Sequence, residues 1–330
     1  MKTILELIRW KNILFLACSL LLMQYAVVNP TLAIYGFEPQ LNSIQTLLMV
    51  VGISLIAAGG YAINDYFDVK IDEINKPMQR IVGRLMDRRQ AMIYHQIFTV
   101  IGALCGISLA IWLRSFTLGI IYVFIPGLLW FYSASYKRQF FIGNLIVAFH
   151  LALSFLIIAI ANAIPLTNQY GTLLHETPIL KQVYGWTSGF AIFAFLCTLL
   201  REIIKDIEDE KGDREFECHT LPIKLGINKT KWVLYALIAV ICGLLCYVNY
   251  SLLYFPIKGS LSTRYLIFGL LLPFAALVYL IITAKHKRDY HNASTMCKFI
   301  MALGVLYSVI YYYLLARQYG IPLFGLFVVK

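Results

Sequence analysis

Long apolar stretches alternate with short polar segments along the whole chain of 330 residues. About 20 consecutive apolar residues is the length that an α-helix needs to cross the hydrocarbon core of a bilayer. Nine stretches meet this requirement, and we expect each to form a transmembrane helix. They cover residues 12–33, 44–66, 91–113, 116–135, 140–164, 185–205, 231–254, 264–284 and 296–315.

The composition also indicates a membrane protein. Hydrophobic residues make up 60% of the chain and charged residues only 14%, which is more apolar surface than one soluble core could hide. The sizeable loops are expected at 67–90, 165–184, 206–230 and 254–263, and no linker-like tract divides the chain. The fold class predicted is an all-α, polytopic integral membrane protein that packs about nine helices in one bundle, with residues 1–330 forming a single domain.

Lysine and arginine are distributed unevenly between the two predicted sides of the membrane. With nine spans, the N-terminus shares one side with the segments after spans 2, 4, 6 and 8, and that side holds all but six of the 28 basic residues. The positive-inside rule places this side in the cytoplasm, with the plasma membrane as the location in a prokaryote. The net charge of +11 largely follows from this topology, and no nucleic-acid partner is expected.

Six of the eight aspartates fall in two clusters with identical spacing. Each member of the second cluster lies 141 positions after its counterpart, and the clusters follow spans 2 and 6 on the same predicted side. The constant offset predicts pseudo-duplicated halves of about four helices each, with a ninth helix appended. The clusters are Asp65, Asp68 and Asp72, and Asp206, Asp209 and Asp213.

Carboxylates crowded beside hydrocarbon repel one another and lose hydration, so these clusters predict a bound divalent cation. If the helix of span 2 continues past the membrane, Asn64, Asp68 and Asp72 share one face. Hard oxygen ligands suit Mg²⁺, which shares its remaining sites with substrate phosphates. We therefore predict metal ligands at Asn64 and all six aspartates, and diphosphate contacts at Arg201 and Lys205. A diphosphate held by Mg²⁺ is a good leaving group.

The chain resembles the UbiA superfamily of intramembrane prenyltransferases, whose members have nine transmembrane helices and two Asp-rich motifs. The first motif, N-x-x-x-D-x-x-x-D, matches Asn64, Asp68 and Asp72, and the second, D-x-x-x-D, matches Asp209 and Asp213. The resemblance implies that the diphosphate of a polyprenyl donor binds Mg²⁺ between the motifs. The donor would then ionise to an allylic cation that alkylates an acceptor.

The resemblance also implies helper residues on the same side of the membrane. Lys137 is expected to contact the diphosphate, and Tyr132 is expected to assist the reaction. The segment NKPMQRIVGR departs from the family pattern, yet Arg80 or Arg84 is expected to reach the diphosphate. Many members have a glycine before the T-L-P string, where this chain has Glu217 and Cys218. The segment YSASYKR supplies Tyr132, Tyr136, Lys137 and Arg138.

The strings around both motifs bear on the acceptor. NDYFDVKIDEINKP, and REIIKDIEDEKGD with TLPIKLG, look most like the branch that alkylates the hydroxyl of geranylgeranylglyceryl phosphate with a geranylgeranyl group. For such an acceptor, Asp72 or Asp213 could take the hydroxyl proton. The alternative acceptor for the same clamp is an aromatic quinone precursor or a tetrapyrrole acid.

Two other protein classes also place acidic groups in membranes. CDP-alcohol phosphotransferases use a single motif with Gly-x-x-Ala-Arg between aspartates, and this chain lacks that pattern. A cation transporter is a remote alternative, because transporters place ionisable residues along a path near the bilayer centre. Here the acidic groups gather at one surface, which favours the enzyme, with membrane lipids as its surroundings.

Overall fold

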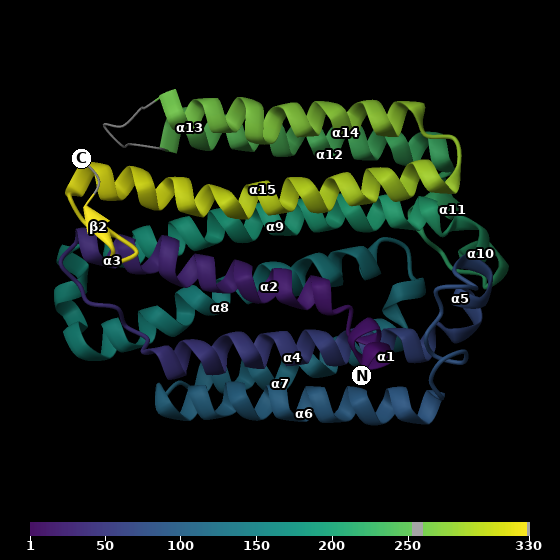
Figure 1. The fold of residues 1–330 in the computed structure, drawn as a ribbon, viewed down its shortest axis with the longest axis horizontal. Coiled ribbons are helices and arrows are strands. Elements are labelled where there is room, and N and C mark those ends of the chain that lie inside the picture. The colour runs from purple at the N-terminus through teal and green to yellow at the C-terminus, as the bar shows by residue number, and fades with distance from the viewer. Residues whose placement is uncertain (253–259, 329–330) are drawn as a thin grey trace.

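The computed structural model describes residues 1–252 and 260–328, which are almost entirely helical (Figure 1). Over these ranges, nine helical segments are long and apolar enough to cross a membrane. They run alongside one another in a single bundle, with three short helices gathered at one end (Figure 1): α5 (Val69–Asn75), α10 (Glu210–Glu215) and α11 (Leu221–Leu225). The prediction of an all-α, polytopic bundle of nine spans is therefore confirmed.

Each predicted span corresponds to one helix or to a run of continuous helical segments. The first three spans are α2 (Trp10–Leu22) with the π-helix η1 (Met23–Val28) and α3 (Asn29–Ile34), then α4 (Ser43–Phe67), then α6 (Arg88–Trp112). The middle three are α7 (Phe116–Ala134), α8 (Ile142–Tyr170) and α9 (Ile179–Glu208). The last three are α12 (Ile227–Tyr247) with the π-helix η4 (Val248–Leu252), then α13 (Ser260–Arg264) with the π-helix η5 (Tyr265–Leu271) and α14 (Leu272–Thr283), and finally α15 (Lys287–Tyr319).

Shorter elements connect and flank the spans. Helix α1 precedes the first span, and a two-stranded antiparallel hairpin follows the last. These elements are α1 (Lys2–Leu7), α5 (Val69–Asn75), η2 (Tyr136–Arg138), η3 (Gly171–Glu176), α10 (Glu210–Glu215), α11 (Leu221–Leu225), β1 (Pro322–Leu323) and β2 (Phe327–Val328).

Three of the predicted loops contain more helix than expected. The segment 67–90 holds α5, the segment 206–230 holds α10 and α11, and the segment 165–184 holds the ends of α8 and α9. Hydropathy detects only the part of a helix that is apolar, so polar turns beyond the bilayer were missed. In the fourth predicted loop, 254–263, residues 253–259 lie outside the described residues.

Two spans contain a π-helical stretch directly before a proline. Pro30 lies in the first turn of α3, after η1, and Pro273 lies in the first turn of α14, after η5. Proline lacks an N–H, so a regular α-helix would leave a carbonyl of the preceding turn without its donor. In the wider turn of a π-helix each carbonyl accepts a hydrogen bond from a different N–H, which changes the pairing before the proline. This matters because the hydrocarbon core contains no water that could replace a missing N–H donor.

The chain bends at the same aspartate in both motifs. Asp68 ends α4 and begins α5, with φ −85° and ψ 0°. Asp209 ends α9 and begins α10, with φ −99° and ψ 6°. The 141-residue offset in the sequence therefore corresponds to a repeated local structure, a long spanning helix followed by a short helix.

Close packing between α4 and α6 fixes the position of the first motif. A Cβ on Gly102 would lie 2.9 Å from the carbonyl oxygen of Gly52, and a Cβ on Gly59 would overlap the hydroxyl of Thr99. His95 of α6 also makes a 2.9 Å hydrogen bond to the Gly59 carbonyl. Small residues let two helix backbones approach closely in a membrane. These contacts fix one face of α4 against α6, and the opposite face of α4 lines a cavity.

We expect Glu217→Gly to stabilise the protein. Glu217 has φ +53°, a left-handed conformation that costs a residue with a side chain about 1–2 kcal/mol and that glycine adopts readily. The gain of about 1 kcal/mol in the free energy of unfolding would raise the midpoint of thermal unfolding in detergent. Gly226→Ala is the matched control, because Gly226 has φ +81° and open space around its Cα. It should lower the same midpoint, and an unchanged or lower midpoint for Glu217→Gly would contradict the expectation.

Candidate active site

A cavity of about 580 Å³ lies inside the bundle, between α2, α4, α7, α8, α9 and α15. Its mouth is polar and lies where α4 and α9 end, and its deeper walls are mainly apolar. Along α4 the lining extends from Asp68 at the mouth to Ile53. At 1.5 Å per helical residue this is a depth of about 22 Å, enough for an extended chain of several isoprene units.

A ring of apolar and aromatic side chains forms the floor of the cavity. Ile53, Ile157 and Phe190 belong to it, together with Tyr122, which is fully buried. The Tyr122 hydroxyl donates a 3.4 Å hydrogen bond to the Met49 carbonyl. Among the described residues this floor carries no charged side chain. A polar path to the other side of the membrane is therefore not formed here, which disfavours a cation transporter.

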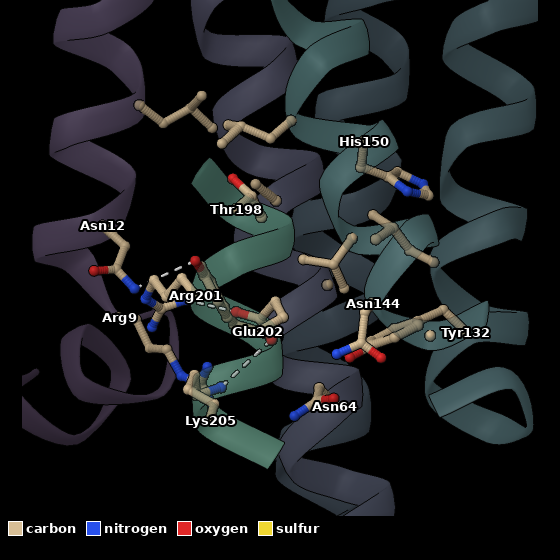
Figure 2. A pocket seen from close by; sticks show the side chains of 18 of the residues that line it. Arg9, Asn12, Asn64, Tyr132, Asn144, His150, Thr198, Arg201, Glu202 and Lys205 are labelled. Atoms are coloured by element: carbon tan, nitrogen blue, oxygen red, sulfur yellow. Dashed lines mark hydrogen bonds and ion pairs between the residues drawn. The ribbon is translucent and has the colours of Figure 1, made fainter. Parts of the chain in front are cut away.

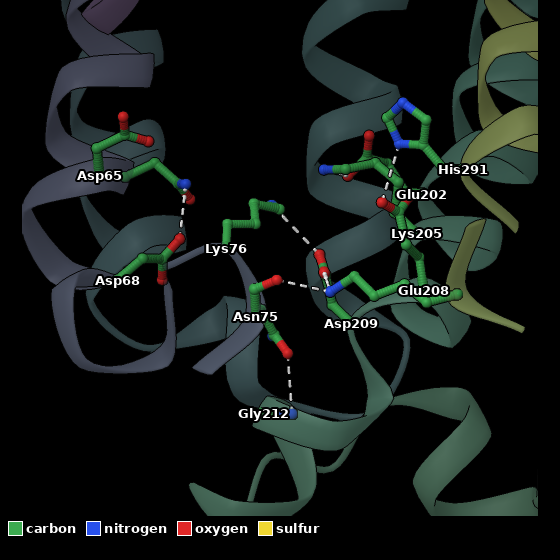
Figure 3. Close-up of polar contacts among 12 residues, drawn as sticks. Asp65, Asp68, Asn75, Lys76, Glu202, Lys205, Glu208, Asp209, Gly212 and His291 are labelled. Atoms are coloured by element: carbon green, nitrogen blue, oxygen red, sulfur yellow. Dashed lines mark hydrogen bonds and ion pairs between the residues drawn. The ribbon is translucent and has the colours of Figure 1, made fainter. Parts of the chain in front are cut away.

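The two motifs meet directly through the short helices that follow them. Gly212 of α10 donates its backbone N–H to Oδ1 of Asn75 in α5 at 3.0 Å. Lys287, at the start of α15, donates to the Asn75 carbonyl at 2.7 Å and pairs with Asp209 Oδ1 at 3.4 Å. Figure 3 shows Asn75 and Lys76 between the side that carries Asp68 and the side that carries Asp209. The motifs thus form one site, as the sequence predicts.

Basic and amide side chains hold three of the motif carboxylates. Asp68 is buried, accepts a 2.7 Å hydrogen bond from Asn64 Nδ2 and pairs with Lys137. Asp209 pairs with Lys76 at 3.4 Å as well as with Lys287. The third, Asp206, accepts a 2.7 Å hydrogen bond from Asn144 Nδ2 of α8. The structure therefore brings donors from α4, η2, α8, α15 and the residue after α5 to one set of carboxylates.

Neighbouring charges at the mouth shift the pKa values of Lys137 and Asp209 toward the charged forms. Burial alone would lower the pKa of Lys137, but Asp68, Tyr132 and Asp72 together outweigh this effect and raise it. Burial alone would likewise raise the pKa of Asp209, but four nearby lysines together outweigh this effect and lower it: Lys76, Lys205, Lys287 and Lys137. The charged forms of Lys137 and Asp209 are thus favoured at the mouth, where a lysine could instead contact a phosphate.

Asp72 and Asp213 differ from the other carboxylates that line the mouth. Within the described part of the chain neither side chain makes an ion pair or a side-chain hydrogen bond, whereas Asp206, which also lacks an ion pair, accepts a hydrogen bond from Asn144. Burial raises the pKa of both carboxyls, that of Asp213 to about 6. A cation bound beside them would supply the close countercharge that no lysine within ion-pair distance provides, so this pair fits the predicted metal site best.

The donor atoms at the mouth fit Mg²⁺. Carboxylate and amide oxygens are hard ligands, and Mg²⁺ commonly uses one or two carboxylates while keeping waters and substrate phosphates in its other positions. Among the described residues no three Asp, Glu, His or Cys side chains already converge as one metal cluster. This agrees with a site that phosphate oxygens complete. The lining contains Asn64, Asp68, Asp72, Asp206, Asp209 and Asp213.

Four residues singled out in the sequence do not line this cavity. Asp65 instead pairs with Arg9 at 3.0 Å, so we remove it from the expected metal ligands. Arg80 pairs with Glu73 at 3.2 Å, away from the mouth. The other two are Arg84, which donates to the Met78 carbonyl, and Tyr136, which lines a separate apolar groove beside α6 and α7.

The remaining predicted residues do reach the cavity, and others join them. Tyr132, Lys137, Arg201 and Lys205 line it, as does Arg138. Sequence reasoning missed several further groups because they come from distant helices or loops. A usable signal existed for Asn75, Lys76 and Glu202, which lie within the strings around the two motifs. The missed lining residues with charged or amide side chains are Arg9, Lys11, Asn12, Asn75, Lys76, Asn144, Glu202 and Lys298.

The polar lining has two sides (Figure 2). Asn64, Tyr132 and Asn144 lie on one side, from α4, α7 and α8. Arg9, Asn12, Arg201, Glu202 and Lys205 gather on the other side, around α9 and the start of α2. Glu202 accepts from Arg201 at 2.5 Å and pairs with Lys205 at 3.6 Å.

A membrane-embedded apolar cavity with two joined Asp-rich motifs at its mouth defines an intramembrane prenyltransferase. The model of the UbiA prenyltransferase family matches residues 27–304, most of the chain. The protein belongs to the UbiA prenyltransferase family, and it is a prenyltransferase.

Curated relatives extend over almost the full length. A digeranylgeranylglyceryl phosphate synthase of Methanosphaera stadtmanae is 30% identical over 92% of this chain and 97% of its own. The enzyme of the same name from Sulfurisphaera tokodaii is 31% identical over 92% of this chain and 95% of its own.

Solved structures show the same fold. A digeranylgeranylglyceryl phosphate synthase superposes with a TM-score of 0.61 at 24% identity, covering 94% of this chain and 98% of its own. A UbiA homologue from Archaeoglobus fulgidus, bound to GPP and Mg²⁺, superposes with a TM-score of 0.58 at 17% identity, covering 92% of this chain and 98% of its own.

Proposed function

We propose that the protein transfers a geranylgeranyl group from its diphosphate to the hydroxyl of geranylgeranylglyceryl phosphate, with Mg²⁺ as the cofactor. The observation that carries this proposal is the junction of the two motifs above a deep apolar cavity. The near full-length relatives that bear the name digeranylgeranylglyceryl phosphate synthase support the choice of acceptor.

The diphosphate of the donor would bind at the mouth, between α5 and α10. When bound, Mg²⁺ would neutralise the diphosphate and stabilise the charge that develops on it as a leaving group. Lys76, Lys137 and Lys205 would contact phosphate oxygens, because each already lies beside a motif carboxylate or lines the same mouth. Residues proposed to hold the metal are Asn64, Asp68, Asp72, Asp206, Asp209 and Asp213.

The apolar part of the donor would extend into the cavity toward the floor. Its walls exclude water, which protects an allylic cation from hydrolysis until the acceptor reacts. Tyr132 lines the cavity on the α7 side and presents an aromatic ring, whose face attracts cations. We propose this ring as the group that stabilises the cation.

The reaction breaks the bond between the first prenyl carbon and the diphosphate oxygen, and it forms an ether bond to the acceptor oxygen. The hydroxyl proton must leave as this bond forms. Asp72 and Asp213 line the mouth and make no ion pair with a described residue, so whichever of the two is left free of metal is proposed as the base. We further propose that the mouth faces the cytoplasm, following the distribution of basic residues.

An assay with purified protein tests this function. Labelled geranylgeranyl diphosphate and geranylgeranylglyceryl phosphate should give a diether lipid and free diphosphate, with no turnover when EDTA removes divalent ions. An aromatic quinone precursor offered in place of the lipid is the control acceptor. Prenylation of that compound, without diether formation, would overturn the proposed acceptor while leaving the prenyltransferase class intact.

A further inference from the structure

We propose that Arg9, Arg201 and Lys298 form a second anion subsite within the cavity, which binds the phosphate of the acceptor. The inference rests on the proposed function and adds the residues that would select a phosphorylated acceptor over a neutral one. The subsite is separate from the mouth lysines assigned above to the donor diphosphate.

The first observation is an excess of positive charge on one side of the cavity. Apart from the mouth lysines, three cationic side chains line it there, on α9, α15 and the turn between α1 and α2: Arg9, Arg201 and Lys298. Two carboxylates contact this group, Glu202 and Asp65. At least one positive charge therefore lacks a countercharge within this cluster. A phosphate monoester is close to a dianion at neutral pH and would supply it.

The second observation is that donors of this cluster remain available to a ligand. Nε of Arg201 is buried and has no hydrogen-bond partner among the described residues, although Nη1 of the same guanidinium contacts Glu202. Lys298 makes no ion pair within the part of the chain that is described, yet it lies within electrostatic range of Arg9, Arg201 and Glu202. Arginine offers a planar set of donors that matches phosphate oxygens.

The third observation is the position of this cluster relative to the donor site. Arg201 precedes Asp209 by eight residues on α9, so it lies about 12 Å deeper along the helix axis. Figure 2 shows Arg9 and Arg201 across the cavity from Asn64 and Asn144. A phosphate held by Arg201 therefore lies deeper in the cavity than a diphosphate held at Asp209. Arg9, which pairs with Asp65, lies between these two positions and the first motif. The phosphate at Arg201 is near enough for a hydroxyl a few bonds from it to approach the first prenyl carbon.

The cavity is also open where this subsite would be filled. Lys298 on α15 and Lys11 and Phe15 on α2 line it and are exposed at the surface of the bundle. A lipid with a phosphate head and an apolar tail could therefore place its head in the cluster while its tail stays in contact with the membrane. A small aromatic acceptor would not need this arrangement.

Binding measured without the donor tests the subsite directly. The ligands are geranylgeranylglyceryl phosphate and the same lipid without phosphate, each added in EDTA so that no metal bridge forms. The wild-type protein should prefer the phosphorylated lipid. Arg201→Gln and Lys298→Gln should each weaken its binding roughly 10- to 100-fold, the effect of losing a charged hydrogen bond, and should leave binding of the neutral lipid the same.

Steady-state kinetics gives an independent readout. Each variant should raise KM for the phosphorylated acceptor, whereas KM for the donor diphosphate should change far less. Arg288→Gln on α15 is the matched control, because Arg288 is exposed and does not line the cavity. Lys298 is itself exposed, so its variant keeps the test available even if Arg201→Gln fails to fold.

Three results separate the possible failures. Equal binding of both lipids by the wild-type protein would overturn the subsite, and so would full discrimination in both variants. In either case diether synthesis would still support the proposed function. Absence of diether synthesis by the wild-type protein would overturn the proposed function itself.

Discussion

Asp68→Asn and Asp209→Asn should each reduce prenyl transfer by roughly 10³-fold or more while leaving the protein folded in detergent. Both side chains line the mouth, and each stands at the bend between a spanning helix and its short helix. Asparagine keeps the shape but loses the negative charge that a divalent cation requires. Production of diphosphate from labelled donor, measured with saturating Mg²⁺ and acceptor, is the readout.

Matched controls for these variants exist on the same short helices. Glu73→Gln on α5 and Glu215→Gln on α10 also remove one carboxylate, but neither residue lines the cavity. Both controls should retain most of the activity. If only one of the two aspartate variants lost activity, the motifs would not act together on one diphosphate, and the proposed mechanism would be wrong.

Gly212→Ala should lower the turnover rate by roughly 10²-fold without removing any group that contacts the substrate. A Cβ at this position would lie 2.5 Å from Oδ1 and 2.6 Å from Cγ of Asn75. Asn75 is buried, so α10 must move away from α5, and the hydrogen bond from the Gly212 N–H is lost. Displacement of catalytic groups by about 1 Å is enough for such a loss of rate. Single-turnover kinetics would measure it.

A double-mutant cycle shows whether this contact is the cause. Asn75→Ala removes the hydrogen-bond acceptor but leaves room for a methyl group at position 212. The double variant should therefore be no slower than Asn75→Ala alone. Gly189→Ala on α9 serves as the control for added volume, because a Cβ there meets nothing within 4 Å. Additive losses in the cycle would show that Gly212 acts through some other contact.

The spans and the carboxylates could be predicted from sequence because each depends on a local pattern. Helix length and apolar composition respond to the bilayer, and the spacing of Asp68 and Asp72 follows from helical periodicity. The partners of these carboxylates could not be predicted in the same way. Lys287 reaches Asn75 and Asp209 from far along the chain, and only tertiary packing brings them together.

Two errors have a related cause. Asp65 shares the spacing of its cluster, but the helix turns it toward Arg9, so equal spacing did not imply an equal direction. Arg80 lies near the first motif in sequence, yet Glu73 holds it away from the mouth. Asp206, in contrast, reaches the cavity where Asn144 donates to it. The two halves therefore share a backbone plan without sharing the role of every acidic position.

The floor of the cavity has a consequence for the length of the prenyl chain. A Cβ on Gly106 would overlap the Tyr122 ring, so the ring is pressed against the backbone of α6 and cannot swing away to admit more carbons. A rigid barrier of this kind selects donors by excluding those that are too long, rather than by adapting to each. Evolution could therefore alter the size of the membrane lipid made by exchanging one aromatic residue, far from the chemistry at the opposite end.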